Sequence, residues 1–486
     1  MHNCLNIYQI FFNHKKEIEM NNLNFKLYFN QALMSVAAVL VIAVSASFAC
    51  DIAVVSGRVT TNGRPLIWKN RDCSADWHQQ IRYFDAETAE AGGYLMVYNY
   101  DEIAKMNNGD EINPSGGLNA AGFANACTSV YEDFNPIHEA FNINTDLIRE
   151  SLQKCVTVED FETLLMNWRD LHPGKVISGN FVVIDAAGGA SLFECYTGNN
   201  LLFDMKFTRF DANNGEVKEY INGEYVVLEE AVDDFIGFYN RANNHTNTDY
   251  ITINFGEERK IRATDILNDL ADAENLNYRT VMREVSEDVT GQQSYNSGST
   301  DERYSTTYCI SRNQTRLGLV VDGVKAGEDS ALSTFWCALG EPSIAVYAPY
   351  FVAAEEVSYL SYIDGIGIDG TLYDFNATSL LTRASNRREA YDNLIYKANT
   401  GSALTGMDYK LMNKPELYKV QEWAFVLEDD VLDITEDYID DMREAPELIT
   451  RNNLSFFSNY CVEYIYNNYQ KASFDYYSWD FEKSWQ

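Results

Sequence analysis

The sequence has few basic residues and lacks the common cofactor motifs. It contains 37 Lys and Arg against 72 Asp and Glu, which gives a formal net charge of −35. Because such a surface repels a polyanionic backbone, we do not expect nucleic acid as a partner. The chain has no Walker A, GxGxxG or HExxH motif and no CxxC pair, and its six His residues stand singly. We therefore expect neither a metal site nor an organic cofactor.

The chain also lacks internal repeats and any Pro-, Gly- or Ser-rich linker. Hydrophobic residues make up 46% of its 486 residues, and aromatic residues make up 13%. This composition supplies enough apolar surface for a large buried core, so we expect a globular protein. The excess acid is spread along the chain and indicates a solubilising surface rather than an acidic docking site.

The N-terminal region has the pattern of a secretory signal. Lys26 precedes an apolar run, Ala32–Ala46, of the length expected for a signal h-region. Ser47 and Ala49 place small residues three positions and one position before a cleavage point. The run is too short to span a bilayer comfortably, so we expect no stable membrane anchor. Residues 1–49 are predicted to be a signal peptide, and the protein is predicted to be secreted or periplasmic.

Two details of this region bear on the prediction. Residues 1–19 are long for a signal n-region and include Glu17 and Glu19, which makes Met20 a candidate for the true start. Cleavage after Ala49 leaves Cys50 as the first residue of the mature protein. A lipidated Cys50 is an alternative, although Ser47 and Phe48 match a lipoprotein signal poorly. A structural cysteine at a cleavage point is the other alternative.

Strand and helix patterns are both abundant and occur in blocks, which favours an α+β fold with antiparallel sheets. An Asn62-Gly63 turn between apolar runs predicts a first hairpin. The alternation of apolar residues predicts strands at residues 51–59, 65–68, 94–98, 123–130, 180–184, 191–196 and 224–228. The helical period predicts helices at residues 144–154, 158–167, 261–273, 278–285, 384–398 and 415–428.

An N-terminal cysteine carries its own base. Its free α-amine, with an ordinary pKa near 8, can take the thiol proton directly or through one water. The thiolate can then attack a carbonyl, and a fixed donor such as an Asn amide can stabilise the oxyanion. Strand alternation after the hairpin places Lys69 and Arg71 on one face and Asn70 and Asp72 on the other. Because the hairpin returns alongside Cys50, Asp72 is the candidate that holds the amine.

This arrangement resembles the choloylglycine hydrolase family, which includes bile salt hydrolases and penicillin V acylases and belongs to the N-terminal-nucleophile hydrolases. The family begins Cys-Thr and continues to Gly-Arg-Asn-x-Asp, where this chain has Cys50-Asp51 and then Lys69-Asn70-Arg71-Asp72. Asp51 and Lys69 depart from that pattern. Lys69 keeps a positive charge near the thiolate without the fork of a guanidinium.

Further segments carry the same resemblance in the same order. Residues 117–123 and 180–196 are similar to a strand entry and a hairpin of the family. Residues 238–244 resemble the segment with the oxyanion Asn, which implies that role for Asn243, with Asn213 as a competitor. Residues 258–264 resemble the segment with an active-site Arg, which implies that role for Arg259. The family has a second Asn near the oxyanion, and the matching position in this chain is Ser129. We therefore do not assign the bile salt substrate of that family to this chain.

The resemblance implies a four-layer αββα sandwich of two antiparallel sheets. It does not explain the last hundred residues, whose own helical and acidic pattern predicts a helical C-terminal extension. It covers Cys50–Thr264 and extends less clearly to Tyr350, so we expect a catalytic domain over residues 50–380 and the extension over residues 381–486. Residues 305–316 and 335–349 also resemble secreted dipeptidases of the same superfamily. The implied activity is hydrolysis of a small-molecule linear amide, such as an N-acyl amino acid, a bile-salt-like conjugate or a related compound. A dipeptidase, an acyltransferase and a non-enzymatic lipoprotein are the alternatives, and a homo-oligomer is left open.

Overall fold

The computed structural model of the chain describes residues 50–73, 79–99, 114–130, 144–173, 175, 177–197, 205–221, 223–246, 256–290, 303–306, 308–312, 314–361, 396–398 and 410–483. The expectations for the signal peptide, for the start at Met20 and for a helix over residues 384–395 lie outside this set. The expected domain boundary near residue 380 lies outside it as well and stays a prediction.

A six-stranded antiparallel sheet contains the first strand of the described chain. Its order is β12 (Phe238–Arg241), β1 (Cys50–Val55), β2 (Leu66–Asp72), β14 (Thr315–Asp322), β15 (Thr334–Leu339) and β16 (Ala348–Tyr350). Every residue of β1 and β2 is buried. A strand that is covered on both faces has no solvent-facing side, which explains the continuous apolar run at residues 52–55 of β1. The expected first hairpin is confirmed, with a connection that runs from Ser56 to Pro65.

A nine-stranded antiparallel sheet packs face to face against the first. In spatial order it contains β11 (Glu224–Glu229), β10 (Val217–Ile221), β9 (Met205–Asp211), β8 (Ala190–Thr197), β7 (Ser178–Ile184), β6 (Ala124–Ser129), β5 (Pro114–Asn119), β4 (Tyr94–Asn99) and β3 (Gln79–Phe84). Contacts of β1 and β2 with β6 and β7 join the two sheets. The apolar side chains between the sheets, including Ile52, Val54, Ile67 and Val182, belong to the larger core.

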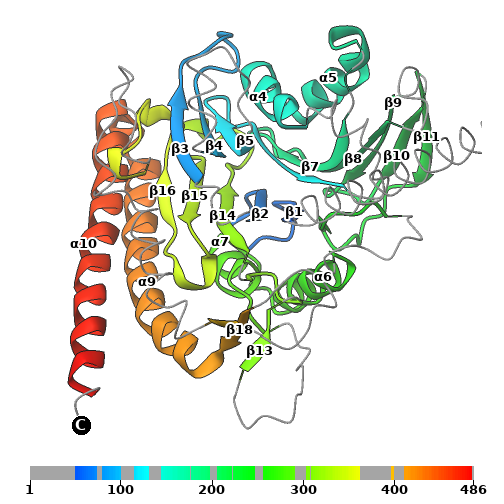
Figure 1. The fold of residues 1–486 in the computed structure, drawn as a ribbon. Coiled ribbons are helices and arrows are strands. Elements are labelled where there is room, and N and C mark those ends of the chain that lie inside the picture. The colour runs from blue at the N-terminus through cyan, green and yellow to red at the C-terminus, as the bar shows by residue number, and fades with distance from the viewer. Residues whose placement is uncertain are drawn as a thin grey trace, which may run out of the picture. The chain divides into compact units, whose positions relative to one another are not determined.

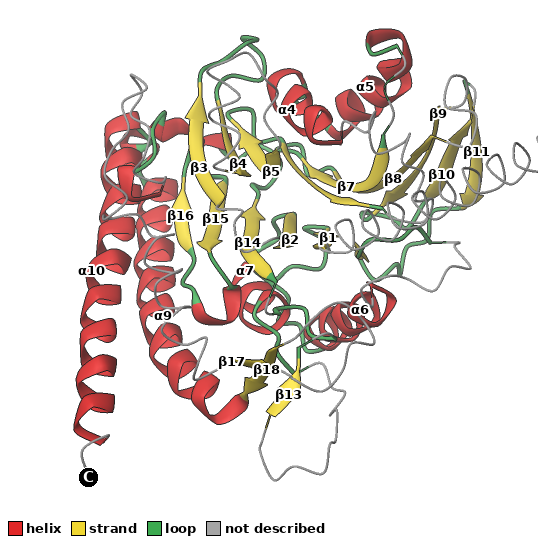
Figure 2. Ribbon diagram, viewed as in Figure 1, coloured by secondary structure: helices red, strands yellow, loops and turns green. Residues whose placement is uncertain are grey.

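Helices cover the outer face of each sheet (Figures 1 and 2). On the nine-stranded sheet lie α4 (Asn144–Lys154) and α5 (Val158–Leu171), with a second apolar core beneath them. The capping box between Thr157 and Asp160 fixes where α5 begins, because each side chain accepts from the other's backbone N–H. On the six-stranded sheet lie α6 (Gly256–Asp272), α7 (Tyr278–Thr280) and a π-helical turn, η1 (Val281–Ser286). The predicted α+β fold with four layers is confirmed.

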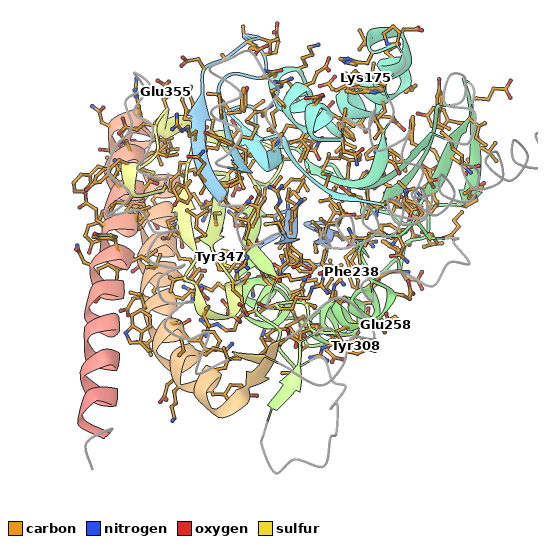
Figure 3. The ribbon with its side chains drawn as sticks, in the orientation of Figure 1. Lys175, Phe238, Glu258, Tyr308, Tyr347 and Glu355 are labelled. Carbon is orange, nitrogen blue, oxygen red and sulfur yellow. The ribbon has the colours of Figure 1, made fainter. Side chains whose placement is uncertain are left out.

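Two long helices form the C-terminal part of the described chain. These are α9 (Lys414–Glu444) and α10 (Arg451–Lys483), and they pack beside β16 and the short 3-10 turns near it. Ser458 Oγ donates to the carbonyl of Pro349, and the Phe457 ring lies against Phe351. Tyr347, labelled in Figure 3, links α9 to η1: its N–H donates to Glu428 Oε2 at 3.3 Å, and its hydroxyl forms a hydrogen bond with Ser286 Oγ. The predicted helical extension is confirmed.

The remaining elements are short. A three-stranded sheet joins β13 (Arg303–Ser305), β18 (Lys410–Asn413) and β17 (Tyr396–Ala398). The prediction of helix over residues 396–398 is therefore wrong, because these residues pair with β18 and the tertiary contact overrides local propensity. Five 3-10 turns within the described residues are η2 (Ser330–Leu332), η3 (Pro342–Ile344), η4 (Val352–Ala354), η5 (Tyr359–Ser361) and η6 (Pro446–Leu448). No helix among the described residues is long and apolar enough to cross a membrane.

Candidate active site

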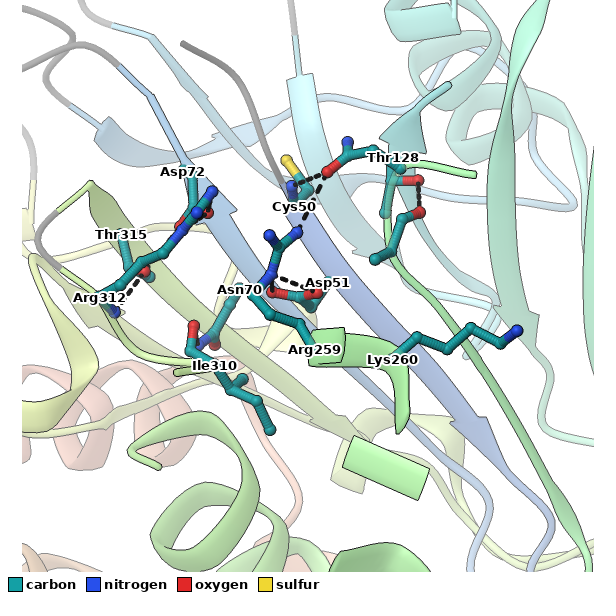
Figure 4. Close-up of polar contacts among 12 residues, drawn as sticks. Cys50, Asp51, Asn70, Asp72, Thr128, Arg259, Lys260, Ile310, Arg312 and Thr315 are labelled. Carbon is teal, nitrogen blue, oxygen red and sulfur yellow. Dashed lines mark hydrogen bonds and ion pairs between the residues drawn. The ribbon is translucent and has the colours of Figure 1, made fainter. Parts of the chain in front are cut away.

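Cys50 is the first residue of β1 and lies between β12 and β2 in the six-stranded sheet. The residue is 9% exposed and therefore largely buried. Its backbone nitrogen donates to Asn243 Oδ1 at 2.9 Å (Figure 4). The sequence resemblance gave Asn243 the role of oxyanion donor, and the structure places its side-chain oxygen on the nitrogen of the candidate nucleophile.

The face of the sheet that carries the Cys50 thiol also carries two cations. In the register of β1 and β2, Cys50 lies opposite Arg71 and Ile52 lies opposite Lys69. Residues directly opposite in an antiparallel pair project to the same face. Lys69 Nζ donates to the carbonyl of Cys127 on β6, and Arg71 Nη1 donates to Gln79 Oε1 at 2.7 Å. Both contacts lie on the nine-stranded sheet, so this face points into the space between the sheets.

The opposite face of the same strands carries two buried acids. Asp51 accepts from Arg259 Nε at 3.0 and 3.1 Å through its two oxygens. Asp72 accepts from Arg312 Nε at 2.5 Å and from Thr315 Oγ1 at 2.6 Å (Figure 4). The predicted separation of Lys69 and Arg71 from Asn70 and Asp72 is therefore confirmed by their contacts.

The expected contact between Asp72 and the Cys50 nitrogen is not among the hydrogen bonds of the described residues. Asp72 accepts hydrogen bonds from Arg312 and Thr315. The Cys50 nitrogen donates to Asn243 instead. Sequence reasoning missed this outcome because Arg312 and Thr315 are more than 200 positions away along the chain. The role of Asp72 at a free α-amine stays a prediction.

Arg259 contacts both Asp51, which follows the candidate nucleophile, and Asn243. It lies on α6, its side chain is fully buried, and its Nη2 donates to Asn243 Oδ1 at 3.3 Å while its Nε holds Asp51. The Nδ2 of Asn243 donates to the carbonyl of Ser129 at 2.8 Å. These bonds fix the amide orientation of Asn243 from both sides. The Ser129 position, where the family has Asn, thus contributes a backbone carbonyl.

Two polar side chains of the nine-stranded sheet hold the Asn243 segment in place. Thr128 Oγ1 donates to the carbonyl of Ala242 at 2.8 Å, and Asn180 Nδ2 donates to the same carbonyl at 3.1 Å. Asn180 Nδ2 also lies 3.2 Å from the carbonyl of Asn244. Sequence reasoning noted the strand that contains Asn180 without giving this residue a role. A buried Asn in an otherwise apolar strand was the available signal.

The competing candidate Asn213 lies elsewhere. Its Nδ2 donates to the carbonyl of Gly188 at 3.1 Å, and its Oδ1 accepts from Ser56 Oγ at 2.6 Å. These contacts place it at the turn after β1, at the far end of that strand from Cys50. The structure therefore brings together Cys50, Asn243, Arg259 and Lys69, and it leaves Asn213 outside the group.

Two thiols near Cys50 are buried in a way that raises their pKa values. Burial raises the pKa of Cys73 to about 12 and also raises the pKa of Cys127, which lies close to Lys69. Both groups therefore stay protonated at neutral pH and are poor nucleophiles. Burial likewise raises the pKa of Asp51, and the Arg259 guanidinium opposes that rise. No group of three or more His, Cys, Asp or Glu within the described ranges is placed to hold a metal ion.

Comparisons with known proteins add the following. No family model matches the sequence, and no curated protein matches it. Among solved structures, two variants of the conjugated bile acid hydrolase from Clostridium perfringens each match at 12% identity and a TM-score of 0.32, over 60% of this chain and 89% of theirs. The N-acylethanolamine-hydrolyzing acid amidase (NAAA) ortholog of Caenorhabditis elegans matches at 13% identity and a TM-score of 0.32, over 56% of this chain and 92% of its own. At this identity and TM-score, these matches carry no argument about the family or the activity of this chain.

Proposed function

We propose that this chain is a thiol-dependent hydrolase of linear amides, in which Cys50 becomes the N-terminal residue and acts as the nucleophile. The observation that carries the proposal is the bond from the Cys50 nitrogen to Asn243, an Asn held in turn by Arg259 and Ser129. A nitrogen that must act as a base needs an oriented acceptor beside it, and this geometry supplies one.

The reaction follows from the groups present. After removal of residues 1–49, the free α-amine of Cys50 takes the thiol proton, and the sulfur forms a bond to the carbonyl carbon of the amide. An amide NH₂ has two donors, and Ser129 takes one donor of Asn243, so the other can serve the oxyanion. The C–N bond then breaks, and the leaving amine takes the proton from the Cys50 ammonium.

Water completes the cycle. It attacks the thioester, gives a proton back to the Cys50 amine, and releases the acid while the thiol is restored. Lys69 lies on the face of the thiol and stabilises the thiolate by its charge. Arg259 keeps Asn243 in the orientation that both steps need. Asp72 is retained as a candidate partner of the free ammonium, which has more N–H groups than Asn243 alone accepts.

The proposal includes export and processing. Intact mass and N-terminal peptide mapping of the protein from its native host test this part. A mature chain that begins with an unmodified Cys50 supports the mechanism. A chain that keeps residues before Cys50, or that carries an acyl group on the Cys50 amine, contradicts it, because neither has a free α-amine to act as the base.

The substrate is tested with a panel of N-acyl amino acids, bile salt conjugates and dipeptides, assayed for release of the free amine. We expect hydrolysis of N-acyl amino acids or related linear amides. Cleavage confined to dipeptides would move the assignment to a dipeptidase with the same nucleophile.

A further inference from the structure

Strand β14 contains a bulge beside the candidate active site. Thr315 pairs with Asp72 and Leu317 pairs with Arg71, so Arg316 is an extra residue between two consecutive partners on β2. A bulge of this kind leaves one residue outside the regular pairing and changes the direction of its side chain. Bulges are frequent next to active sites for that reason.

The register places Arg316 on the face of the Cys50 thiol. Thr315 lies on the other face, where its hydroxyl bonds Asp72, and Leu317 is buried opposite Arg71. When two residues of a bulged strand oppose one residue of the partner strand, the pair projects toward the side of that residue. Arg316 and Leu317 therefore share the face of Arg71, which is also the face of Cys50.

The electrostatics of Cys73 agree with this placement. The positive charges of Arg71 and Arg316 lower the pKa of its thiol, and the neighbouring Cys50 raises it, although burial is the largest influence. Arg316 and Cys50 thus both influence the pKa of the Cys73 thiol, so both lie near it. Since β2 is the only strand between β1 and β14, two strand spacings put the Cα atoms of Cys50 and Arg316 roughly 10 Å apart. An Arg side chain covers a large part of that distance.

Arg316 differs in its partners from the three other guanidinium groups near the site, of which Arg71 donates to Gln79 and Ser115. Arg259 is paired with Asp51, and Arg312 is paired with Asp72. Among the residues that the structure describes, no carboxylate forms an ion pair with Arg316, and its buried Nε has no hydrogen-bond partner. The chain carries 72 Asp and Glu, so this is not a shortage of acids. A partly buried guanidinium without a counter-charge is costly, and an anionic ligand removes the cost.

We propose that Arg316 binds a carboxylate of the substrate beside Cys50, which makes the preferred amide an anionic one. The inference rests on the proposed function, because it needs Cys50 as the nucleophile. A guanidinium fork matches a carboxylate with two parallel hydrogen bonds, whereas Lys69 offers only a point charge. Arg316 selects the substrate, and Asn243 and the Cys50 amine perform the chemistry.

The test uses two alkylating reagents of nearly the same shape, iodoacetate and iodoacetamide, on the mature protein. Each forms a bond from the Cys50 sulfur to the CH₂ carbon and releases iodide, and the thiol proton passes to the amine. Peptide mass mapping assigns the label to Cys50. The measured quantity is the ratio of the iodoacetate rate to the iodoacetamide rate, divided by the same ratio for free cysteine. Since only iodoacetate carries a carboxylate, this ratio reports recognition of the anion.

We expect a corrected ratio well above one for the natural protein and a loss of about 10-fold or more in Arg316→Gln, the size of a charged hydrogen-bonded pair. Arg316→Lys should recover part of the ratio. Arg451→Gln, which removes the same charge from an exposed position on α10, should keep the natural ratio. A natural ratio near one, or an unchanged ratio in Arg316→Gln, overturns the inference and leaves the nucleophile intact. Absence of label on Cys50 with both reagents overturns the proposed function and this inference with it.

Discussion

The guanidinium of Arg259 holds the carboxylate of Asp51 at 3.0 Å, and both side chains are almost completely buried. Asp51 follows the candidate nucleophile directly along β1, and Arg259 also donates to the Asn243 oxygen that accepts from the Cys50 nitrogen. The position where the choloylglycine hydrolase family has Thr therefore carries a charge that positions the site. This role was not found from the sequence, where Asp51 counted only as a departure from the pattern.

Asp51→Asn should reduce amide hydrolysis about 10- to 100-fold through kcat, because Arg259 then loses its anchor and Asn243 loses its fixed orientation. It should also lower the free energy of unfolding by about 3–5 kcal/mol, the usual cost of leaving one member of a buried pair without its partner. Steady-state kinetics and urea unfolding measure the two effects.

A double variant separates positioning from stability. Asp51→Leu combined with Arg259→Met removes both buried charges, so it should recover much of the lost stability without recovering kcat. Asp440→Asn breaks an exposed ion pair on α9 and should change neither quantity by much. If the double variant regains both stability and activity, Asp51 has only a structural role.

Asn243→Ala should lower kcat about 100- to 1,000-fold, the range found when one oxyanion donor is removed. The same substitution at Asn213, whose partners are Gly188 and Ser56, is the matched control and should keep the natural kcat. Amine release from the best substrate of the panel measures both. A greater loss in Asn213→Ala than in Asn243→Ala would show that the donor was assigned to the wrong residue.

Asp322 should make folding stability depend on pH. Burial raises its pKa to about 7 from the ordinary 3.8, and Arg64 and the Asn62 amide only partly oppose this. Between these two values the folded state binds the proton and the unfolded state does not. The free energy of unfolding therefore falls as pH rises from about 4 to about 7, with a slope of at most about 1.4 kcal/mol per pH unit.

Urea unfolding at several pH values checks the prediction for Asp322. Asp322→Asn should flatten the curve in this window, because the amide keeps the shape of the side chain and does not titrate. Asp440→Asn, at a side chain that is 71% exposed on α9, should leave the slope as it is. The assignment of the slope to Asp322 fails if both variants give the natural curve.

Local patterns were sufficient to predict the first hairpin, the faces of Lys69 and Asp72, and most of α6, although the predicted range 261–273 begins after Arg259. These predictions rest on strand alternation and helical period, which can be recognised in a short stretch of sequence. The partners of Asp72 could not be predicted in this way, since β2 pairs with β14 across more than 200 positions of chain. Pairing of strands so distant depends on the assembled core and leaves no local signal.

Strands β14 and β15 were also missed for a physical reason. Both are buried on the two faces, so Thr334–Leu339 shows no alternation that would separate a strand from a buried helical segment. The bulge at Arg316 follows from the same long-range pairing. The positions that the sequence left unassigned, Arg312, Thr315 and Arg316, all lie in this late segment.

The most direct test of the nucleophile is the pair of measurements on Cys50→Ser: amide hydrolysis and the thermal melt of the mature protein. Serine keeps the backbone bond to Asn243 and changes one atom, so the melting temperature should stay nearly the same. Amide hydrolysis should be lost, because the hydroxyl is far less acidic than the thiol in this site. Full activity in a folded Cys50→Ser protein would contradict the role of Cys50 as the thiol nucleophile.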